Sequence, residues 1–237
     1  MPMDALNAIF RSGDALCRRN VSAVVQSSVL DLPAPPASLE ADWQREISRQ
    51  MCLEPGDIET LPLARTRFRW PELGRCIDAV RRWMAEMDLP EVLDNSDMAL
   101  MASRGTRYHH DGGQYGGSVF CNVFLSADSG TDFHFPASGH RIALKRGTAV
   151  IFDPCQPHAI IRSGSPGFDA ADFGLDMRPQ VFLTWELPVE HDAIKKAFGI
   201  TLLIDPGPSA QDAEERVLRN GLPVTLCPAT GTWLSLS

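Results

Sequence analysis

Two hydrophobic patterns divide the chain near residue 98. Before this point apolar residues recur every three or four positions, which is typical of amphipathic helices. In residues 38–51 they lie four apart, which predicts a helix with Ser38 as its N-cap. The same spacing predicts a helix over residues 73–87, and we expect a further helix over residues 3–19.

From residue 98 onward the pattern changes to short apolar runs separated by glycine-containing turns. These runs predict strands at residues 98–103, 118–126, 131–135, 140–144, 148–152, 158–162 and 180–187. Many short strands in close succession favour a β-sandwich, a barrel or a jelly roll. Beyond them, helices are expected at residues 190–198 and 211–220 and a strand at residues 222–226.

These elements predict a mainly β fold with flanking helices in a single domain. Residues 1–97 form a helical N-terminal segment in this interpretation. Residues 98–188 form the β core, and residues 189–237 form a mixed C-terminal extension that packs on the core or mediates dimerisation. A homodimer is therefore compatible with the sequence.

Composition narrows the classes of partner. A formal net charge of -8 and a pI near 5.2 argue against a nucleic-acid partner, which would need a basic patch. No apolar run reaches the length of a membrane span, and no signal peptide is recognisable at the start, so we expect a cytoplasmic protein. The six cysteines are widely spaced and form no Cys-x-x-Cys motif, which favours reduced thiols.

The strongest chemical signal is His109-His110-Asp111, followed by His158 after 47 residues. Alternate residues of a strand share one face, so His109 and Asp111 can point inward while His110 points away. Two imidazoles and a carboxylate on one face suit a non-haem Fe(II) site that leaves positions open for a co-substrate and O2. The alternative for each residue alone is a simple His–Asp hydrogen bond or a structural histidine. We favour the metal site because the intervening strands can bring His158 beside the pair.

With these motifs, residues 98–188 resemble the Fe(II)- and 2-oxoglutarate-dependent oxygenases. The matching features are His109-x-Asp111, the strand at 118–126, the run at 144–152, the distal His158 and a basic residue before the last strand. The resemblance implies a double-stranded β-helix (jelly-roll) core with His109, Asp111 and His158 as ligands of a catalytic Fe(II). It also implies 2-oxoglutarate as co-substrate and O2 as oxidant. Because Asp111 is present, it implies hydroxylation, desaturation or cyclisation instead of halogenation.

The resemblance further implies an arginine or lysine that holds the far carboxylate of 2-oxoglutarate. Arg178 is the favoured candidate, with Gln180 on the same strand face. Arg162 is the rival, because it has the strand parity of His158. Asn122, in the middle of an apolar strand, either binds the co-substrate carboxylate near the iron or faces outward.

Residues near the metal motif in sequence are expected to bind a small-molecule substrate. They are Arg104, Arg107, Tyr108, Gln114, Tyr115 and His134. The basic members suit a carboxylate-bearing substrate, such as an amino acid or a natural-product intermediate. The glycine-rich segment 112–117 and the long connection 163–177 could cover the site.

Two other functions remain open at this point. One is a cupin-type metal dioxygenase without 2-oxoglutarate, in which His134 and His140 are ligands. The other is a non-catalytic β-barrel binding module in which the triad is incidental. Metal content separates the last from the first two, and dependence on 2-oxoglutarate separates the oxygenase from the cupin-type enzyme.

Overall fold

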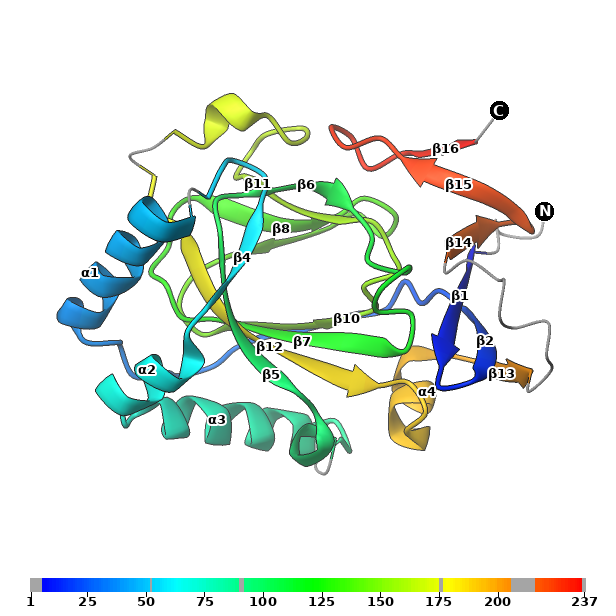
Figure 1. The fold of residues 1–237 in the computed structure, drawn as a ribbon, viewed down its shortest axis with the longest axis horizontal. Coiled ribbons are helices and arrows are strands. Elements are labelled where there is room, and N and C mark those ends of the chain that lie inside the picture. Colours follow the sequence, from blue (N-terminus) through cyan, green and yellow to red (C-terminus); the bar gives the residue numbers. More distant parts are fainter. Residues whose placement is uncertain (1–5, 52, 90–91, 175–176, 206–215, 236–237) are drawn as a thin grey trace.

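The computed structural model describes residues 6–51, 53–89, 92–174, 177–205 and 216–235. Figure 1 shows α1 and α2 at one side of a stack of strands, α3 running beneath it, and β1, β14 and β16 at the side opposite α1. The helices are α1 (Ala37–Glu46), α2 (Leu63–Arg69), α3 (Leu73–Glu86) and α4 (Asp192–Phe198), with a π-helical turn at Ile47–Met51 and 3-10 turns at Leu93–Asn95 and Ala170–Asp172. Within these ranges, no helix has the length and apolarity that a membrane crossing requires.

Most of the remaining chain is β-strand. The strands before the core are β1 (Leu6–Ser12), β2 (Ala15–Asn20), β3 (Val25–Val29) and β4 (Ile58–Leu61). The core strands are β5 (Met98–Ser103), β6 (Thr106–His109), β7 (Ser118–Phe124), β8 (Thr131–Phe135), β9 (His140–Ala143), β10 (Thr148–Phe152), β11 (His158–Arg162) and β12 (Gln180–Pro188). The last strands are β13 (Leu202–Asp205), β14 (Arg216–Arg219), β15 (Leu222–Leu226) and β16 (Trp233–Ser235).

Two antiparallel sheets face each other in the core. The larger has the strand order β3-β10-β7-β12-β5-β4, and the smaller has the order β6-β11-β8-β9. In Figure 1 the smaller sheet lies above the larger one. Apart from the pairs β4–β5 and β8–β9, neighbouring strands are not consecutive, so the chain passes repeatedly between the two sheets.

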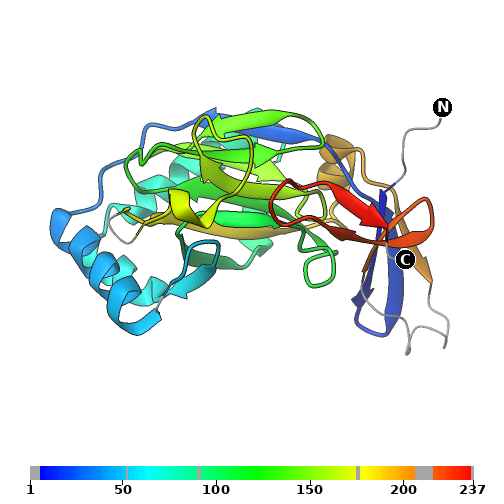
Figure 2. The ribbon, with the colours of Figure 1, turned by 90° about the horizontal axis from the view of Figure 1, so that it is seen from above.

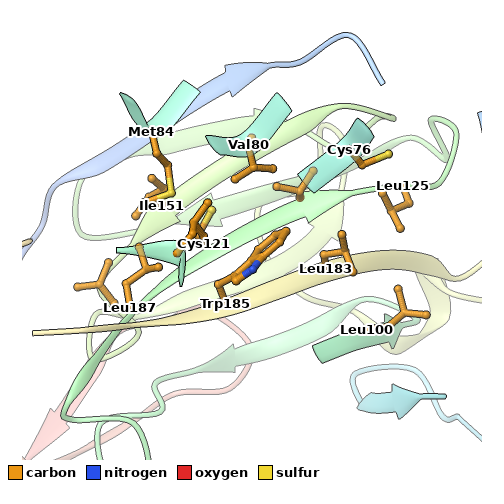
Figure 3. Close-up of a cluster of buried hydrophobic side chains, with 14 of the residues drawn as sticks. Cys76, Val80, Met84, Leu100, Cys121, Leu125, Ile151, Leu183, Trp185 and Leu187 are labelled. Atoms are coloured by element: carbon orange, nitrogen blue, oxygen red, sulfur yellow. The ribbon is translucent and has the colours of Figure 1, made fainter. Parts of the chain in front are cut away.

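The larger sheet buries apolar side chains on both faces. On its outer face, Leu183 and Trp185 of β12 and Cys121 of β7 belong to a buried cluster that also contains Val80 and Met84 of α3 (Figure 3). The buried residues of α3 recur every three or four positions and so form an apolar stripe along one side of the helix. This side covers the sheet. Full burial of one such aliphatic side chain contributes about 1.5–3 kcal/mol, which makes this layer a main source of stability.

The opposite face of the same strands points into the space between the sheets. It meets aromatic residues of the smaller sheet in a second cluster, which contains Phe124, Phe133, Phe135, Phe152 and Phe182. Because residues alternate along a strand, each large-sheet strand gives one set of side chains to the helices and the other to this interior.

A third sheet, which we call the terminal sheet, joins the two ends of the chain. Its order is β13-β2-β1-β14-β15-β16, so strands from the first 20 residues pair with strands from the last 40. Figure 2 shows it at one end of the molecule, beyond the facing sheets. The predicted strand at residues 222–226 is therefore confirmed as β15, and the C-terminal extension does pack beside the core.

Several sequence predictions are confirmed at their bounds, namely the strands at residues 98–103, 131–135, 148–152 and 158–162. Those at 118–126, 140–144 and 180–187 are confirmed with ends shifted by one or two residues, and helices are present within 73–87 and 190–198. The helix expected at 38–51 is α1 followed by the π-helical turn. It starts at Ala37 behind Pro36 and has no side-chain cap, so the prediction for Ser38 was wrong.

Two predicted helices are corrected. Instead of a helix over residues 3–19, the described part from Leu6 onward forms the hairpin of β1 and β2, closed by a turn at Gly13 and Asp14. Residues 1–97 are accordingly helical only in part. The helix expected at 211–220 is strand β14 over Arg216–Arg219, and residues 211–215 lie outside the described residues.

Candidate metal centre

The three predicted ligands meet at the edge of the smaller sheet. His109 ends β6 and His158 begins β11, and the two residues are direct partners across these antiparallel strands. Asp111 lies two residues beyond β6, where its backbone N–H donates to the carbonyl of Pro154 at 2.9 Å. One potential ligand atom from each side chain lies within 4.8 Å of the other two. Residues 47 positions apart are thereby gathered into one site.

Both imidazoles are oriented by the backbone. Nδ1–H of His109 donates to the carbonyl of Arg107 at 2.7 Å, and Nδ1–H of His158 donates to the carbonyl of Gln156 at 2.9 Å. A carbonyl only accepts, so in each neutral ring Nε2 keeps its lone pair. The Nε2 atoms lie 3.8 Å (His109) and 3.6 Å (His158) from Oδ2 of Asp111. Metal-ligating histidines commonly have this second-nitrogen hydrogen bond, so the donor set fits a divalent first-row metal.

Burial makes the triad electrostatically unfavourable without a cation. Burial, and next the charge of His109, hold the pKa of His158 well below its ordinary value of 6.5. Burial also raises the pKa of Asp111, although the nearby His109 opposes this rise. The neutral imidazole of His158 is ready to ligate, and a bound cation would compensate the carboxylate for its lost hydration.

The triad opens into a cavity of about 710 Å³ between the two facing sheets. Its walls include Phe120, Phe133, Phe152 and Phe182. The Phe152 ring lies 4.9 Å from the His158 ring, so the most buried ligand is shielded by aromatic carbon. Such walls keep water away from a bound ligand while leaving volume for small molecules.

Asn122 faces this cavity, which decides between its two predicted orientations in favour of the inward one. It lies on β7 opposite Thr184 of β12, and both residues line the cavity. The side chain is 6% exposed, and its Oδ1 has no hydrogen-bond partner among the described residues. Buried polar atoms normally have partners, so this amide is suited to a bound ligand.

The two arginines predicted to hold 2-oxoglutarate lie elsewhere. Arg178 is exposed and borders a different hollow, beside Trp43 and Gln44 at α1. Arg162 is also exposed, and its guanidinium donates to the carbonyl of Ser129 at 3.2 Å. Neither side chain lines the triad cavity. For Arg162 the reason is its place at the far end of β11, beyond the inward-facing residues.

A polar group does lie deeper between the sheets. Gln180 of β12 is paired with Ser103 of β5, and each has a buried side-chain oxygen without a partner in the described structure. The amide nitrogen of Gln180 donates to Ser129 Oγ at 2.6 Å. Arg104 follows Ser103 directly, is 4% exposed and has an unpartnered Nε. An arginine buried in this way normally faces an anion.

Four of the predicted substrate residues, Arg107, Tyr108, Gln114 and Tyr115, border the cavity. His134 is corrected, because Phe133 and Phe135 occupy the inward positions of β8 and leave His134 on the outer face. There the Nδ1 atom of His134 is hydrogen-bonded to the hydroxyl of Tyr108. Tyr108 borders the cavity, but its hydroxyl group therefore points toward His134 and away from the cavity.

His110 and His140 lie outside the candidate metal cluster. The ring of His110 lies 5.1 Å from that of Trp233 in the terminal sheet, so it points away from the triad as predicted. His140 is exposed and its ring nitrogen contacts Ser138 Oγ at 2.9 Å. Among the described residues, only His109, Asp111 and His158 form a candidate metal cluster, so the cupin-type ligand set with His134 and His140 has no geometric support.

Sequence reasoning missed the buried ion pair that supports the triad. Arg19 of β2 donates to both carboxylate oxygens of Asp153, at 2.6 and 2.8 Å, and both side chains are fully buried. Its Nε also donates to the carbonyl of Gly116 at 2.6 Å. The pair therefore ties the terminal sheet to the loops that follow Asp111 and precede His158. The two residues are 134 positions apart, and no local pattern could have signalled their contact.

Comparison with known proteins gives only distant similarity. No protein-family model and no curated protein matches the sequence. Among solved structures, a viral collagen prolyl hydroxylase from Paramecium Bursaria Chlorella virus-1 is 12% identical with a TM-score of 0.40, covering 69% of this chain and 88% of that one. EvdO2 from Micromonospora carbonacea var. aurantiaca is 13% identical with a TM-score of 0.41, covering 78% and 90%.

A third solved structure, an oxidoreductase of the 2OG-Fe(II) oxygenase family from Burkholderia pseudomallei, is 11% identical with a TM-score of 0.28, covering 74% and 69%. The chain thus resembles solved 2OG-Fe(II) oxygenases. Likeness at these TM-scores has no weight for function, which must be inferred from the site itself.

Proposed function

We propose that this protein is an Fe(II)- and 2-oxoglutarate-dependent oxygenase acting on a small molecule. The observation that supports it most is the convergence of His109, Asp111 and His158, with both Nε2 atoms facing the carboxylate at the wall of an aromatic cavity. The strand order of the two facing sheets supports the accompanying proposal of a double-stranded β-helix core.

The three side chains would hold Fe(II) on one face and leave its other positions toward the cavity. When bound, the iron with 2-oxoglutarate and O2 supplies oxidation of an unactivated C–H bond. The protein's own share is geometric. The backbone carbonyls of Arg107 and Gln156 fix the two imidazoles, while the phenylalanine walls exclude water and hold the substrate.

Asn122 is proposed to bind the carboxylate of 2-oxoglutarate near the metal by donating from its amide N–H2, since the side chain lines the cavity and its Oδ1 has no partner among the described residues. For the far carboxylate, we propose the polar group of Gln180, Ser103 and Arg104. Of these, the buried Arg104 guanidinium and the Ser103 hydroxyl can both donate to a carboxylate, and neither the Arg104 Nε nor the Ser103 Oγ has a partner among the described residues. Arg178 stays the alternative anchor, since its role is not settled by its exposed position.

The test is an anaerobic titration of the metal-free protein with Fe(II) and 2-oxoglutarate. It follows the weak visible charge-transfer band expected for the bidentate keto-acid complex. The band should form in the wild type and be lost in His109→Ala. It should persist in the matched control His110→Ala, because that ring packs on Trp233 outside the cavity.

The same titration discriminates the anchors. We expect a weaker band at a given 2-oxoglutarate concentration in Arg104→Met but not in Arg162→Met, while weakening in Arg178→Met alone would restore the anchor predicted from the sequence. Iron binding without any band would contradict the 2-oxoglutarate proposal and favour a cupin-type reaction. Failure to bind metal would leave a non-catalytic module.

A further inference from the structure

The cavity has an excess of acidic residues. Its lining includes the carboxylates of Asp57, Glu59, Asp111 and Glu186, against a single guanidinium from Arg107. Arg107 already lies 3.4 Å from Asp57, and Asp111 belongs to the triad. Glu59 of β4 and Glu186 of β12 are therefore left on the larger sheet without an ion pair among the described residues. Glu59 is exposed to solvent, whereas Glu186 is half-buried.

Glu186 lies on the strand face that builds the cavity. Phe182, Thr184 and Glu186 are alternate residues of β12, and all three line the same space. Across the sheet Glu186 is paired with Phe120, whose ring lies 4.9 Å from that of Tyr115. The carboxylate is thus bordered by two aromatic rings, a combination that suits an organic cation.

The Glu186 carboxylate has no ion pair or side-chain hydrogen bond among the described residues. Burial, followed by the charge of Asp97, raises the pKa of Glu186. Both causes destabilise the ionised form, and a cation bound beside it would reverse them. No lysine or arginine of the described chain supplies that cation, because Arg107 on the facing sheet is the one basic residue other than histidine in the lining.

Tyr115 connects this carboxylate to the metal centre. The backbone N–H of Tyr115 donates to the carbonyl of Asp111 at 2.7 Å. On its other side, the Tyr115 ring lies 4.9 Å from that of Phe120, the cross-strand partner of Glu186. A ligand held at Glu186 would extend past Tyr115 toward the triad.

We propose that Glu186 is the cation subsite of this cavity and that the substrate has an ammonium or guanidinium group. The proposal rests on the proposed oxygenase function for the reaction, but the binding of the cation does not require the metal. Asn122 is an independent sign that this cavity takes a ligand, because its unpartnered amide is more than nine-tenths buried and faces the same space. An amino acid would also satisfy the expectation of a carboxylate, with Arg107 on the opposite sheet.

The experiment is isothermal titration of the metal-free protein with agmatine, cadaverine, phenethylamine, L-arginine and L-lysine. The anion 3-phenylpropionate serves as a counterpart of phenethylamine with similar length and opposite charge. We expect at least one cation to bind and 3-phenylpropionate to bind more weakly than phenethylamine. The cation that binds best should lose about tenfold or more in affinity in Glu186→Gln, which keeps the shape but removes the charge.

Glu190→Gln is the matched control, since Glu190 is exposed just beyond β12 and does not line the cavity. It should leave the affinity unchanged. Thermal unfolding of each variant checks that the fold is retained. Binding of no cation, equal binding to Glu186→Gln, or preference for 3-phenylpropionate would each overturn the proposal.

Repeating the titration after loading with Co(II) separates this proposal from the proposed function. Cation binding that depends on Glu186 without any metal binding would sustain the subsite and refute the oxygenase. Metal and 2-oxoglutarate binding with no effect of Glu186→Gln would do the opposite.

Discussion

The buried ion pair of Arg19 and Asp153 links residues far apart in the chain to the backbone around two of the proposed metal ligands. Asp153 also accepts from the backbone N–H groups of Ser22 at 2.7 Å and Cys155 at 2.9 Å. In Arg19→Met the carboxylate would stay buried without its partner. We expect the free energy of unfolding, measured with urea, to fall by about 3–5 kcal/mol.

The neighbouring Arg18 provides the matched control, because it is on the same strand but exposed. Arg18→Met should change stability by no more than about 0.5 kcal/mol. In a double-mutant cycle, Arg19→Met combined with Asp153→Asn should cost clearly less than the sum of the single changes. Additive costs would show that the two side chains are not coupled.

The low pKa of His158 predicts how stability depends on pH in the metal-free protein. In the unfolded chain this imidazole titrates near 6.5, whereas in the fold its pKa lies well below. Between the two values the unfolded state binds more protons, so the free energy of unfolding falls as the pH is lowered. The slope from this residue reaches up to about 1.4 kcal/mol per pH unit.

Urea unfolding from about pH 7.5 to about pH 5.5 measures this slope. Asp111 contributes in the opposite direction, because its folded-state pKa is raised above its ordinary 3.8. Asp111 is present in both the wild type and His158→Gln, so its contribution cancels when the two are compared. The free energy of unfolding should fall less in His158→Gln than in the wild type as the pH is lowered. If the free energy of unfolding depended on pH equally in the wild type and in His158→Gln, His158 would have to be hydrated in the fold.

At the scale of elements, the positions of many strands could be predicted from the alternation of apolar residues and from turn residues between neighbouring strands. The strand bounds at β8, β10 and β11 follow from short runs with β-branched or aromatic residues near glycine or proline, and β5 follows from a short apolar run that ends before Gly105. The two wrong helices contain turn signals that outweigh their apolar spacing. Asn220 and Gly221 both have positive φ between β14 and β15, as a type I′ hairpin requires, and Gly13 has φ +58° at the first position of the β1–β2 turn.

Two glycines in different elements are expected to respond oppositely to alanine. Gly147, between β9 and β10, has φ +87°, and a Cβ there would lie 2.0 Å from the backbone carbonyl oxygen of Leu30. Gly147→Ala should therefore destabilise the protein by several kcal/mol. Gly74, in the first turn of α3, has nothing within 4 Å of an added Cβ, so Gly74→Ala should stabilise by roughly 0.4–1 kcal/mol.

Thermal unfolding of the two glycine variants is the measurement. The stabilising effect should appear as a higher midpoint in Gly74→Ala with no change in metal binding. A neutral Gly147→Ala would contradict the close approach of the β9–β10 turn to the segment that follows β3.

At the scale of the whole molecule, the decisive contacts join distant parts of the chain. The ligand triad was predictable because His-x-Asp and a later strand-opening histidine share a parity rule. The terminal sheet was not predictable, because Leu6 pairs with Arg219 and no feature of either segment indicates the strand with which it pairs. For a related reason, the sequence could not show whether Arg178 reaches the triad cavity. Parity gives the inward face of a strand, as for Gln180, but not the three-dimensional end of the cavity.

The terminal sheet reaches the metal loops through Val217 of β14. Val217 is buried against Ala8 and Cys155, and a Cβ on Gly112 would lie 2.5 Å from its Cγ2. Gly112 follows Asp111 directly, and Cys155 lies three residues before His158.

The variant Val217→Ala removes two methyl groups from this contact and should loosen both loops. Although Val217 does not line the cavity, Co(II) binding should weaken by about tenfold, the lower end of the range for changes around metal ligands. Leu222→Ala is the control, because Leu222 lies in the next strand and is 70% exposed. Affinities are compared by the visible Co(II) spectrum at a temperature where both variants are folded. Unchanged affinity in Val217→Ala would show that the facing sheets hold the triad without help from the terminal sheet.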